Sequence, residues 1–177
     1  MIERLAKVTD EMSAEELRNW LLDAAKLWLA HDGLWFQSVE ATQGLERAII
    51  HDTEAWGSFS PLEAKRIMKR LDLAPGGGID ALIQCLGHRL YALLNLQQLV
   101  EHSETRCVFR MNTCRVQDAR KRKGLSDFPC KEVGLVEYTT FAATVDPRIR
   151  TRCLACPPDD HPDDWWCTWE FTLEDGA

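Results

Sequence analysis

The sequence has no apolar run of the roughly 20 residues that a membrane-spanning helix needs, which excludes a transmembrane protein of that kind. Its first residues, MIERLAKVTDEMSAEE, carry acidic side chains and no apolar stretch, so no secretory signal is expected. G-x-S-x-G, H-E-x-x-H and nucleotide-binding motifs are absent. The chain has only five histidines that could serve as a catalytic base. We therefore expect a cytoplasmic protein whose reaction, if it has one, carries no familiar signature.

Basic residues are fewer than acidic residues. Lys and Arg number 21 against 28 Asp and Glu, a formal net charge of −7, so a nucleic-acid partner is not expected. Apolar residues make up 45% and charged residues 28%, which is typical of a folded globular chain rather than a disordered one. With 177 residues, the chain is expected to form a single domain, 1–177.

The first part of the chain, residues 1–95, has the pattern of helices. Ser13 and Glu16 form a capping box, which predicts a helix start. Apolar residues then follow at helical spacing until the pattern breaks near Gly33. Ser60-Pro61 predicts another start, because serine caps helices and proline is favoured at the first helical position. We expect this half to form a helical layer.

The second part, residues 96–177, combines strand and helix patterns. Apolar and polar side chains alternate in the three predicted strands, whereas two segments between them have helical spacing. The strands are predicted at 105–112, 148–153 and 165–173, and the helices at 115–123 and 134–145. Helices followed by segregated strands indicate an α+β fold, with the N-terminal helical layer packed on a small antiparallel β-sheet.

Cysteine is the one residue type that is unusually abundant. The seven cysteines are Cys85, Cys107, Cys114, Cys130, Cys153, Cys156 and Cys167. Their number is odd, and the cytoplasm keeps thiols reduced, so a complete disulfide framework is not expected. Metal binding, thiol chemistry or burial must therefore explain them.

Five of these thiols are predicted to converge. Cys153 and Cys167 lie on the core-facing sides of two predicted strands, and Cys153 and Cys156 form a C-x-x-C pair in which one turn supplies two ligands. Cys114 follows another predicted strand, and Cys130 lies in a turn. Because four thiolates complete a tetrahedral site, we expect zinc or an iron–sulfur cluster, bound by four of the five.

Two other interpretations of the thiols stay open. In one, the protein is a metal-free hydrolase of a small molecule, with Cys114, Cys130 or Cys167 as its nucleophile. In the other, the cysteines are packing residues, as we expect for Cys85 and Cys107 on core faces. A non-enzymatic ligand sensor or interaction module is a further alternative.

A small-molecule ligand is the expected partner, and a homodimer is an additional expectation. Trp35 and other tryptophans of the helical half could wall an apolar pocket, and His31 lies nearby beside an aspartate. Residues 106–131 carry eight basic side chains against two acidic ones, so Arg115 and Arg120 are candidates to bind an anionic ligand. The alternative is a solvated face that pairs with the acidic C-terminal segment.

Several segments resemble known families. They are Trp28–Phe36, Cys114–Gly124, Phe128–Lys131, Cys153–Asp159 and Trp166–Trp169. The chain looks like a family of uncharacterised bacterial cytosolic proteins, and more distantly is similar to L-2-amino-thiazoline-4-carboxylic acid hydrolase-like proteins. Its last cysteines also resemble the end of 4-vinyl reductase domains, which are small α+β ligand-binding modules. The first distant resemblance implies a cysteine nucleophile, and the second implies a bound small molecule.

Overall fold

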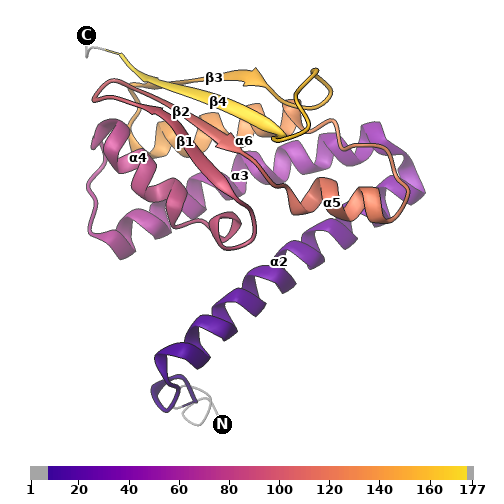
Figure 1. Cartoon of the computed structure of the whole chain (residues 1–177), viewed down its shortest axis with the longest axis horizontal. Helices are drawn as coiled ribbons and strands as arrows, with labels where there is room; N and C mark the ends of the chain where they lie inside the picture. Colours follow the sequence, from indigo (N-terminus) through magenta and orange to yellow (C-terminus); the bar gives the residue numbers. More distant parts are fainter. Residues whose placement is uncertain (1–7, 175–177) are drawn as a thin grey trace.

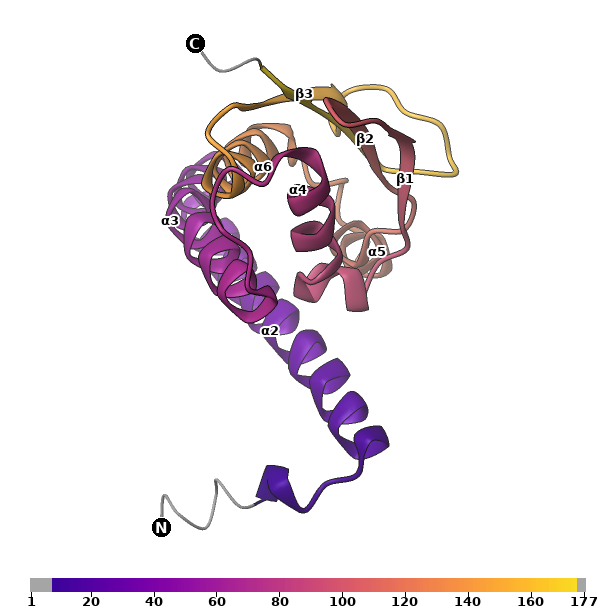
Figure 2. The same cartoon turned by 90° about the vertical axis from the view of Figure 1, so that its left-hand side faces the viewer.

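The computed structural model describes residues 8–174. Its elements are α2 (Ala14–Gln43), α3 (Leu45–Leu71), α4 (Gly78–Gly87), η1 (Leu90–Leu93), β1 (Gln97–His102), β2 (Arg106–Met111), α5 (Arg115–Arg122), α6 (Lys131–Val145), β3 (Ile149–Ala155) and β4 (Cys167–Leu173). Long N-terminal helices pack with α4 and α6 beneath a four-stranded antiparallel sheet (Figures 1 and 2). The predicted α+β fold class is confirmed.

The first long helix, α2, begins as predicted but ends later. The Ser13 hydroxyl accepts a hydrogen bond from the Glu16 backbone amide, and the Glu16 carboxylate accepts one from the Ser13 amide. The predicted break near Gly33 is wrong, because α2 continues to Gln43. Packing of this helix outweighs the ~1 kcal/mol that an interior glycine costs. The chain breaks instead at Gly44, whose φ of 89° favours glycine.

The predicted helix start at Ser60-Pro61 is also wrong, since both residues lie inside α3. Proline in a helix interior costs about 3 kcal/mol, because its ring crowds the carbonyl four residues earlier. That earlier residue is Gly57, where α3 packs so closely on α6 that an added Cβ would lie 3.3 Å from Val136 Cγ1. The packing of α3 on α6 therefore keeps the helix continuous through the proline.

The sheet has the strand order β1-β2-β4-β3, and all neighbouring pairs are antiparallel. The three strands predicted from the sequence correspond to β2, β3 and β4. The edge strand β1 was not predicted: its sequence, QQLVEH, has no clear alternation and its residues are mostly exposed. Apolar side chains on one face of the sheet, including Phe109, Trp169 and Phe171, pack with α4 and α6 in the main core.

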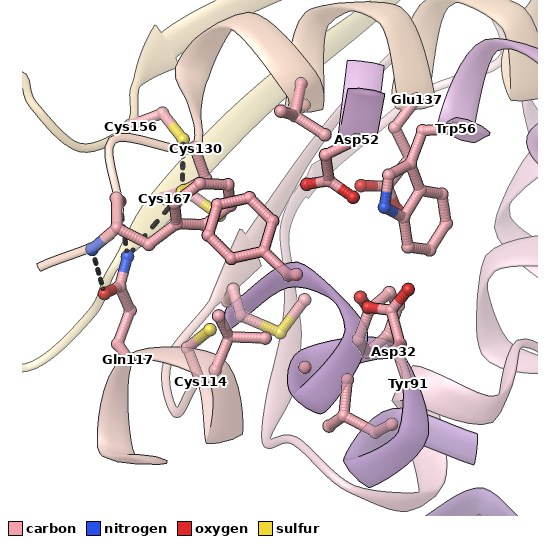
Figure 3. A pocket seen from close by; sticks show the side chains of 18 of the residues that line it. Asp32, Asp52, Trp56, Tyr91, Cys114, Gln117, Cys130, Glu137, Cys156 and Cys167 are labelled. Atoms are coloured by element: carbon pink, nitrogen blue, oxygen red, sulfur yellow. Dashed lines mark hydrogen bonds between the residues drawn. The ribbon is translucent and has the colours of Figure 1, made fainter. Parts of the chain in front are cut away.

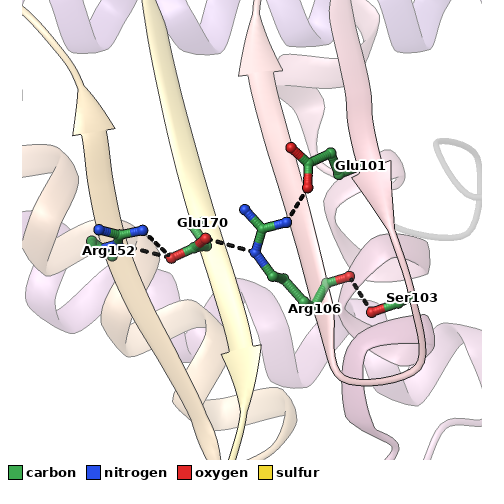
Figure 4. A network of polar contacts seen from close by, with 5 residues as sticks. All are labelled: Glu101, Ser103, Arg106, Arg152 and Glu170. Carbon is green, nitrogen blue, oxygen red and sulfur yellow. Dashed lines mark hydrogen bonds and ion pairs between the residues drawn. The ribbon is translucent and has the colours of Figure 1, made fainter.

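The outer face of the sheet is polar. Glu170 of β4 accepts hydrogen bonds from Arg106 Nε at 2.7 Å and from Arg152 Nε at 2.8 Å, and Arg106 also pairs with Glu101 (Figure 4). One carboxylate thus links β2, β4 and β3 on the solvent side. This network leaves the opposite, apolar face of the sheet to form the core and the site below.

The N-terminal part of α2 projects away from the body of the protein (Figure 1). Only Ala25 and Leu29 of this helix are buried, whereas Leu27, Leu34 and Trp35 are at least 60% exposed. None of the described helices is both long enough and apolar enough to span a membrane.

Candidate functional site

A cavity of about 150 Å³ lies between the long helices and the thiol end of the sheet. Its walls come from α2, α3, α5 and α6, from η1, and from β2 and β4. Most of the lining is apolar, and its thiols and its carboxylates form two separate groups (Figure 3). Gln37, Asn95, Gln117 and Arg120 complete the polar part of the lining. A mainly apolar hollow with a few polar groups is the usual form of a small-molecule site.

Aromatic side chains form much of the apolar wall. Phe36 of α2 packs edge-on against Phe128, with ring centroids 4.9 Å apart. Trp56 of α3 stacks on Tyr91 of η1 at 5.8 Å. Trp169 of β4 closes the floor beside Tyr138, at 4.7 Å. These rings lie on different elements, so tertiary packing holds the wall in place.

The thiol wall carries Cys114, Cys130, Cys156 and Cys167 (Figure 3). The sulfurs of Cys130 and Cys156 are 3.4 Å apart. Gln117, which is 1% exposed, fixes the segment that carries Cys130: its side chain accepts from Phe128 N and donates to Phe128 O, both at 2.9 Å. The helix α5 therefore positions one of the thiols.

The thiols differ in acidity. Cys156 hydrogen-bonds with Cys130, Cys153 and Cys167, and these contacts raise the pKa of Cys156. The hydrogen bond from Cys156, helped by the Lys131 charge, holds the pKa of Cys153 below its usual value. Burial raises the pKa of Cys114 to about 12, which makes it a poor nucleophile at neutral pH. Cys153 is thus the thiol that the site favours as thiolate.

The carboxylate wall is formed by Asp32 of α2, Asp52 of α3 and Glu137 of α6 (Figure 3). Burial raises the pKa of each. The charges of Asp32 and Glu137 add to the effect at Asp52, whose pKa rises to about 7. Arg89 pairs with Glu137 at 2.7 Å and with Glu63 at 2.8 Å. One guanidinium therefore already serves two carboxylates at this end.

The structure brings the five predicted cysteines into one region. Cys130, Cys153 and Cys167 all contact Cys156, while Cys114 lies close enough that the charges of Cys130 and Cys167 act on its pKa. Cys153 alone of the five does not line the cavity. Cys85 and Cys107 are completely buried in the core, as predicted.

The four residues predicted to contact a ligand lie mostly outside the cavity. His31, Trp35 and Arg115 are exposed and do not line it. Arg120 does line it, but its guanidinium is engaged by Glu40, with N–O distances of 2.8 and 2.9 Å. A ligand contact by these residues stays a prediction.

The sequence interpretation missed the residues that line the cavity from α2. Asp32 and Phe36 line the cavity, and they directly follow the predicted residues His31 and Trp35. Because α2 is continuous, a step of one residue turns the side chain by about 100° around the helix. Asp52 and Glu137 carried no motif, although Glu137 stands alone among mostly apolar residues, which was a usable signal.

The predicted metal centre is not preassembled. Between residues 8 and 174, no group of three or more histidine, cysteine, aspartate or glutamate side chains is arranged so that it could hold a metal ion.

The basic segment (106–131) and the acidic C-terminal segment (159–177) are in contact. Lys131 of the first forms an ion pair with Asp159 of the second at 2.8 Å. The last acidic residue, Asp175, lies outside the described residues.

Two solved structures share the fold. The phenol-responsive sensory domain of the transcription activator PoxR, solved with phenol, is 16% identical with a TM-score of 0.54, covering 81% of this chain and 73% of that one. A trafficking protein particle complex subunit 3 from Naegleria fowleri, covalently bound to palmitic acid, is 11% identical with a TM-score of 0.52, covering 86% and 96%.

No curated protein matches the chain at a significant level. At these identities the two structural similarities establish the fold alone. The sequence itself is matched by a family description that covers nearly all of the described chain. Residues 9–173 match DUF6125, a family of unknown function, and the chain belongs to that family.

Proposed function

We propose that this protein is a ligand-binding domain that holds a small, mainly apolar molecule in its cavity. The observation that carries the proposal is the cavity itself: about 150 Å³, mainly apolar, with aromatic rings forming much of its wall. An apolar cavity of about this volume accommodates a single benzene ring. The phenol bound by the PoxR sensory domain, which shares the fold, supports a ligand of this size.

The test is a titration with single-ring compounds, starting with toluene and phenol. Binding is measured by calorimetry and by intrinsic tryptophan fluorescence, to which Trp56 and Trp169 of the cavity contribute. Val116→Phe fills part of the cavity, whereas Val100→Phe makes the same change on the exposed strand β1. We expect Val116→Phe to weaken binding at least tenfold and Val100→Phe to leave it unchanged. Failure of all single-ring compounds to bind, or an equal effect of the two changes, contradicts the proposal.

Metal binding by the thiols is a second candidate, favoured by the contacts of three cysteines with Cys156. Zinc–sulfur bonds of about 2.3 Å place tetrahedral thiolates about 3.8 Å apart, which is close to the 3.4 Å between the sulfurs of Cys130 and Cys156. Elemental analysis of protein purified without oxygen tests it. About one zinc per chain, lost in Cys156→Ser but not in the core variant Cys85→Ser, supports this role, and metal-free protein rejects it.

We also infer that α2 pairs with a second copy of the chain. One seven-residue pattern recurs along the helix: Leu17, Trp20, Leu21; Ala24, Leu27, Trp28; His31, Leu34, Trp35. All of these except Trp28 are exposed. Apart from His31, the repeat is apolar over three heptads, which is typical of helices that pair.

Charge favours an antiparallel pair. Glu16 and Gln37 occupy the same heptad position, so antiparallel pairing brings Glu16 of one copy beside Gln37 of the other, which Lys123 contacts at 2.6 Å. Sedimentation analysis tests the pair with Leu27→Glu, which is 70% exposed on the stripe, and Leu62→Glu, which is 51% exposed on α3. A dimer that Leu27→Glu alone dissociates is the expected result, and a monomeric wild type overturns the inference.

A further inference from the structure

The carboxylate end of the cavity has little positive charge to spare for Asp32 and Asp52. Glu137 shares Arg89 with Glu63, so the single guanidinium there is already divided between two carboxylates. Among residues 8–174, no lysine or arginine forms an ion pair with Asp32 or Asp52. The partners that act on them are the indole of Trp56, which hydrogen-bonds Asp52, and His31, whose charge acts on Asp32.

This arrangement is costly for two ionised carboxylates. An acidic side chain that loses water needs hydrogen bonds or an opposite charge to remain ionised. Asp32 and Asp52 come from different helices and face the same space, and each is more than half buried. Because burial disfavours the ionised form, the pKa of both carboxyls is raised, to about 7 for Asp52.

We propose that the cavity selects a small protonated amine: one apolar ring on an arm of one or two carbons, with the ammonium group held between Asp32 and Asp52. The ring lies against Phe36, Trp56 and Phe128, and the ammonium supplies the charge that this end lacks. An ammonium donates three hydrogen bonds and accepts none, which suits a wall of carboxylates. The same wall repels carboxylate and phenolate ligands. This inference rests on the ligand-binding function proposed above and specifies its ligand class.

The pH dependence follows from the groups around Asp52. They are Asp32 and His31 on α2, Trp56 on its own helix, Arg89 and Tyr91 near η1, and Glu137 on α6. Between pH 6 and 8 the change in amine affinity is set by deprotonation of Asp52, which strengthens binding. With a pKa of about 7, the ionised fraction of Asp52 rises about tenfold over this range. The affinity for a neutral ring compound is not expected to increase when Asp52 ionises.

The experiment is calorimetric titration of the full chain with benzylamine, toluene and benzoate at pH 6, 7 and 8. We expect benzylamine to bind at least tenfold more tightly than toluene at pH 8, to lose about tenfold at pH 6, and benzoate not to bind. Asp52→Asn is expected to remove the advantage of benzylamine over toluene. Asp23→Asn, a change at a 66% exposed position of α2, is the matched control and leaves both affinities unchanged.

Each of the other possible outcomes contradicts the amine inference, the ligand-binding function or both. Toluene binding as tight as or tighter than benzylamine overturns the amine inference but supports the ligand-binding function. Binding of neither compound overturns both. Benzoate binding more tightly than benzylamine reverses the proposed charge preference. If Asp52→Asn weakens toluene and benzylamine by the same factor, Asp52 shapes the cavity rather than selecting charge, and the inference is again overturned.

Discussion

Cys130 and Cys156 hold their sulfur atoms 3.4 Å apart at one end of the cavity, although 26 positions separate them in the chain. Cys130 precedes α6, where Gln117 fixes the local backbone, and Cys156 follows β3. The contact places a pair of thiols, rather than a single thiol, against any ligand in the cavity. Cys156 also forms a hydrogen bond with the sulfur of Cys153, and this bond lowers the pKa of Cys153.

Cys153 is predicted to be the most reactive of the seven thiols. Its pKa is lowered by the hydrogen bond from Cys156 and by the charge of Lys131, and thiolates alone react rapidly with alkylating agents. Iodoacetamide modification followed by peptide mass spectrometry should label Cys153 first, and Cys85 and Cys107 last. Both are completely buried, and burial raises their pKa to about 11 and 12. Lys131→Met should shift the midpoint of Cys153 labelling to higher pH. Equal labelling rates in the folded protein contradict the prediction.

Arg89 is predicted to be the most costly charged residue to remove. It is 2% exposed, pairs with Glu63 and Glu137, and lies 4.8 Å from the ring centre of Phe141. Arg89→Met leaves two buried carboxylates without their cation, which should cost about 3–5 kcal/mol of unfolding free energy in urea. Arg150→Met, at a 58% exposed position, should change stability by less than about 0.5 kcal/mol.

The pH response provides a second check on Arg89. Burial raises the pKa of Glu137 even with Arg89 present, and loss of the guanidinium removes the main opposing influence. A carboxyl whose folded pKa lies above its unfolded value binds more protons in the folded state, so stability rises as pH falls. Arg89→Met should therefore regain part of its loss between pH 7 and pH 5. A loss independent of pH would assign the effect to packing alone.

Local signals in the sequence predicted the sheet core and one helix start well. The Ser13–Glu16 capping box is a contact over three residues, and the alternation in β2, β3 and β4 follows from burial of one sheet face. Pro61 failed as a start signal because packing on α6 outweighs its local cost. The edge strand β1 gave no signal because its side chains are mostly exposed.

The candidate site was harder to predict than the fold. Cysteine spacing suggested a thiol cluster, and tertiary packing does bring Cys130, Cys153 and Cys167 to Cys156. The carboxylate wall could not be recognised in the same way. Asp32 and Asp52 line the same cavity only because two long helices pack side by side. The burial that raises the pKa of both carboxyls depends on this packing and cannot be read from the local sequence.

Two glycines on the cavity wall should respond oppositely to alanine. A Cβ on Gly134 would lie 2.7 Å from Cζ2 of Trp169, whereas a Cβ on Gly33 would meet nothing within 4 Å. Gly134→Ala should cost about 1–3 kcal/mol through overpacking and shift Trp169 fluorescence. Gly33→Ala should add about 0.5–1 kcal/mol, because alanine favours the helix. Urea unfolding measures both, and the same sign for the two changes contradicts the packing described for this wall.

Asp146 is predicted to anchor the start of α4 to the end of α6. Its buried carboxylate accepts hydrogen bonds from Gly78 N at 3.0 Å and from Arg148 N at 3.0 Å, and it pairs with Arg148 Nη2 at 2.7 Å. Asp146→Asn should lower the unfolding free energy by about 1–3 kcal/mol at pH 7, because hydrogen bonds to a charged acceptor are lost. Asp164→Asn, in an exposed loop, is the control and should have little effect.

The sign of the pH effect follows from the same contacts. The hydrogen bonds from Arg148 hold the pKa of Asp146 at about 2, below the usual value of 3.8. A carboxyl whose folded pKa is lowered contributes stability above its unfolded pKa and loses it as pH falls through the folded one. The difference between wild type and Asp146→Asn should therefore be constant above about pH 5 and shrink between pH 4 and pH 2. Urea unfolding across this range measures it, and a difference that grows with acid would show that the carboxylate is not the stabilising form.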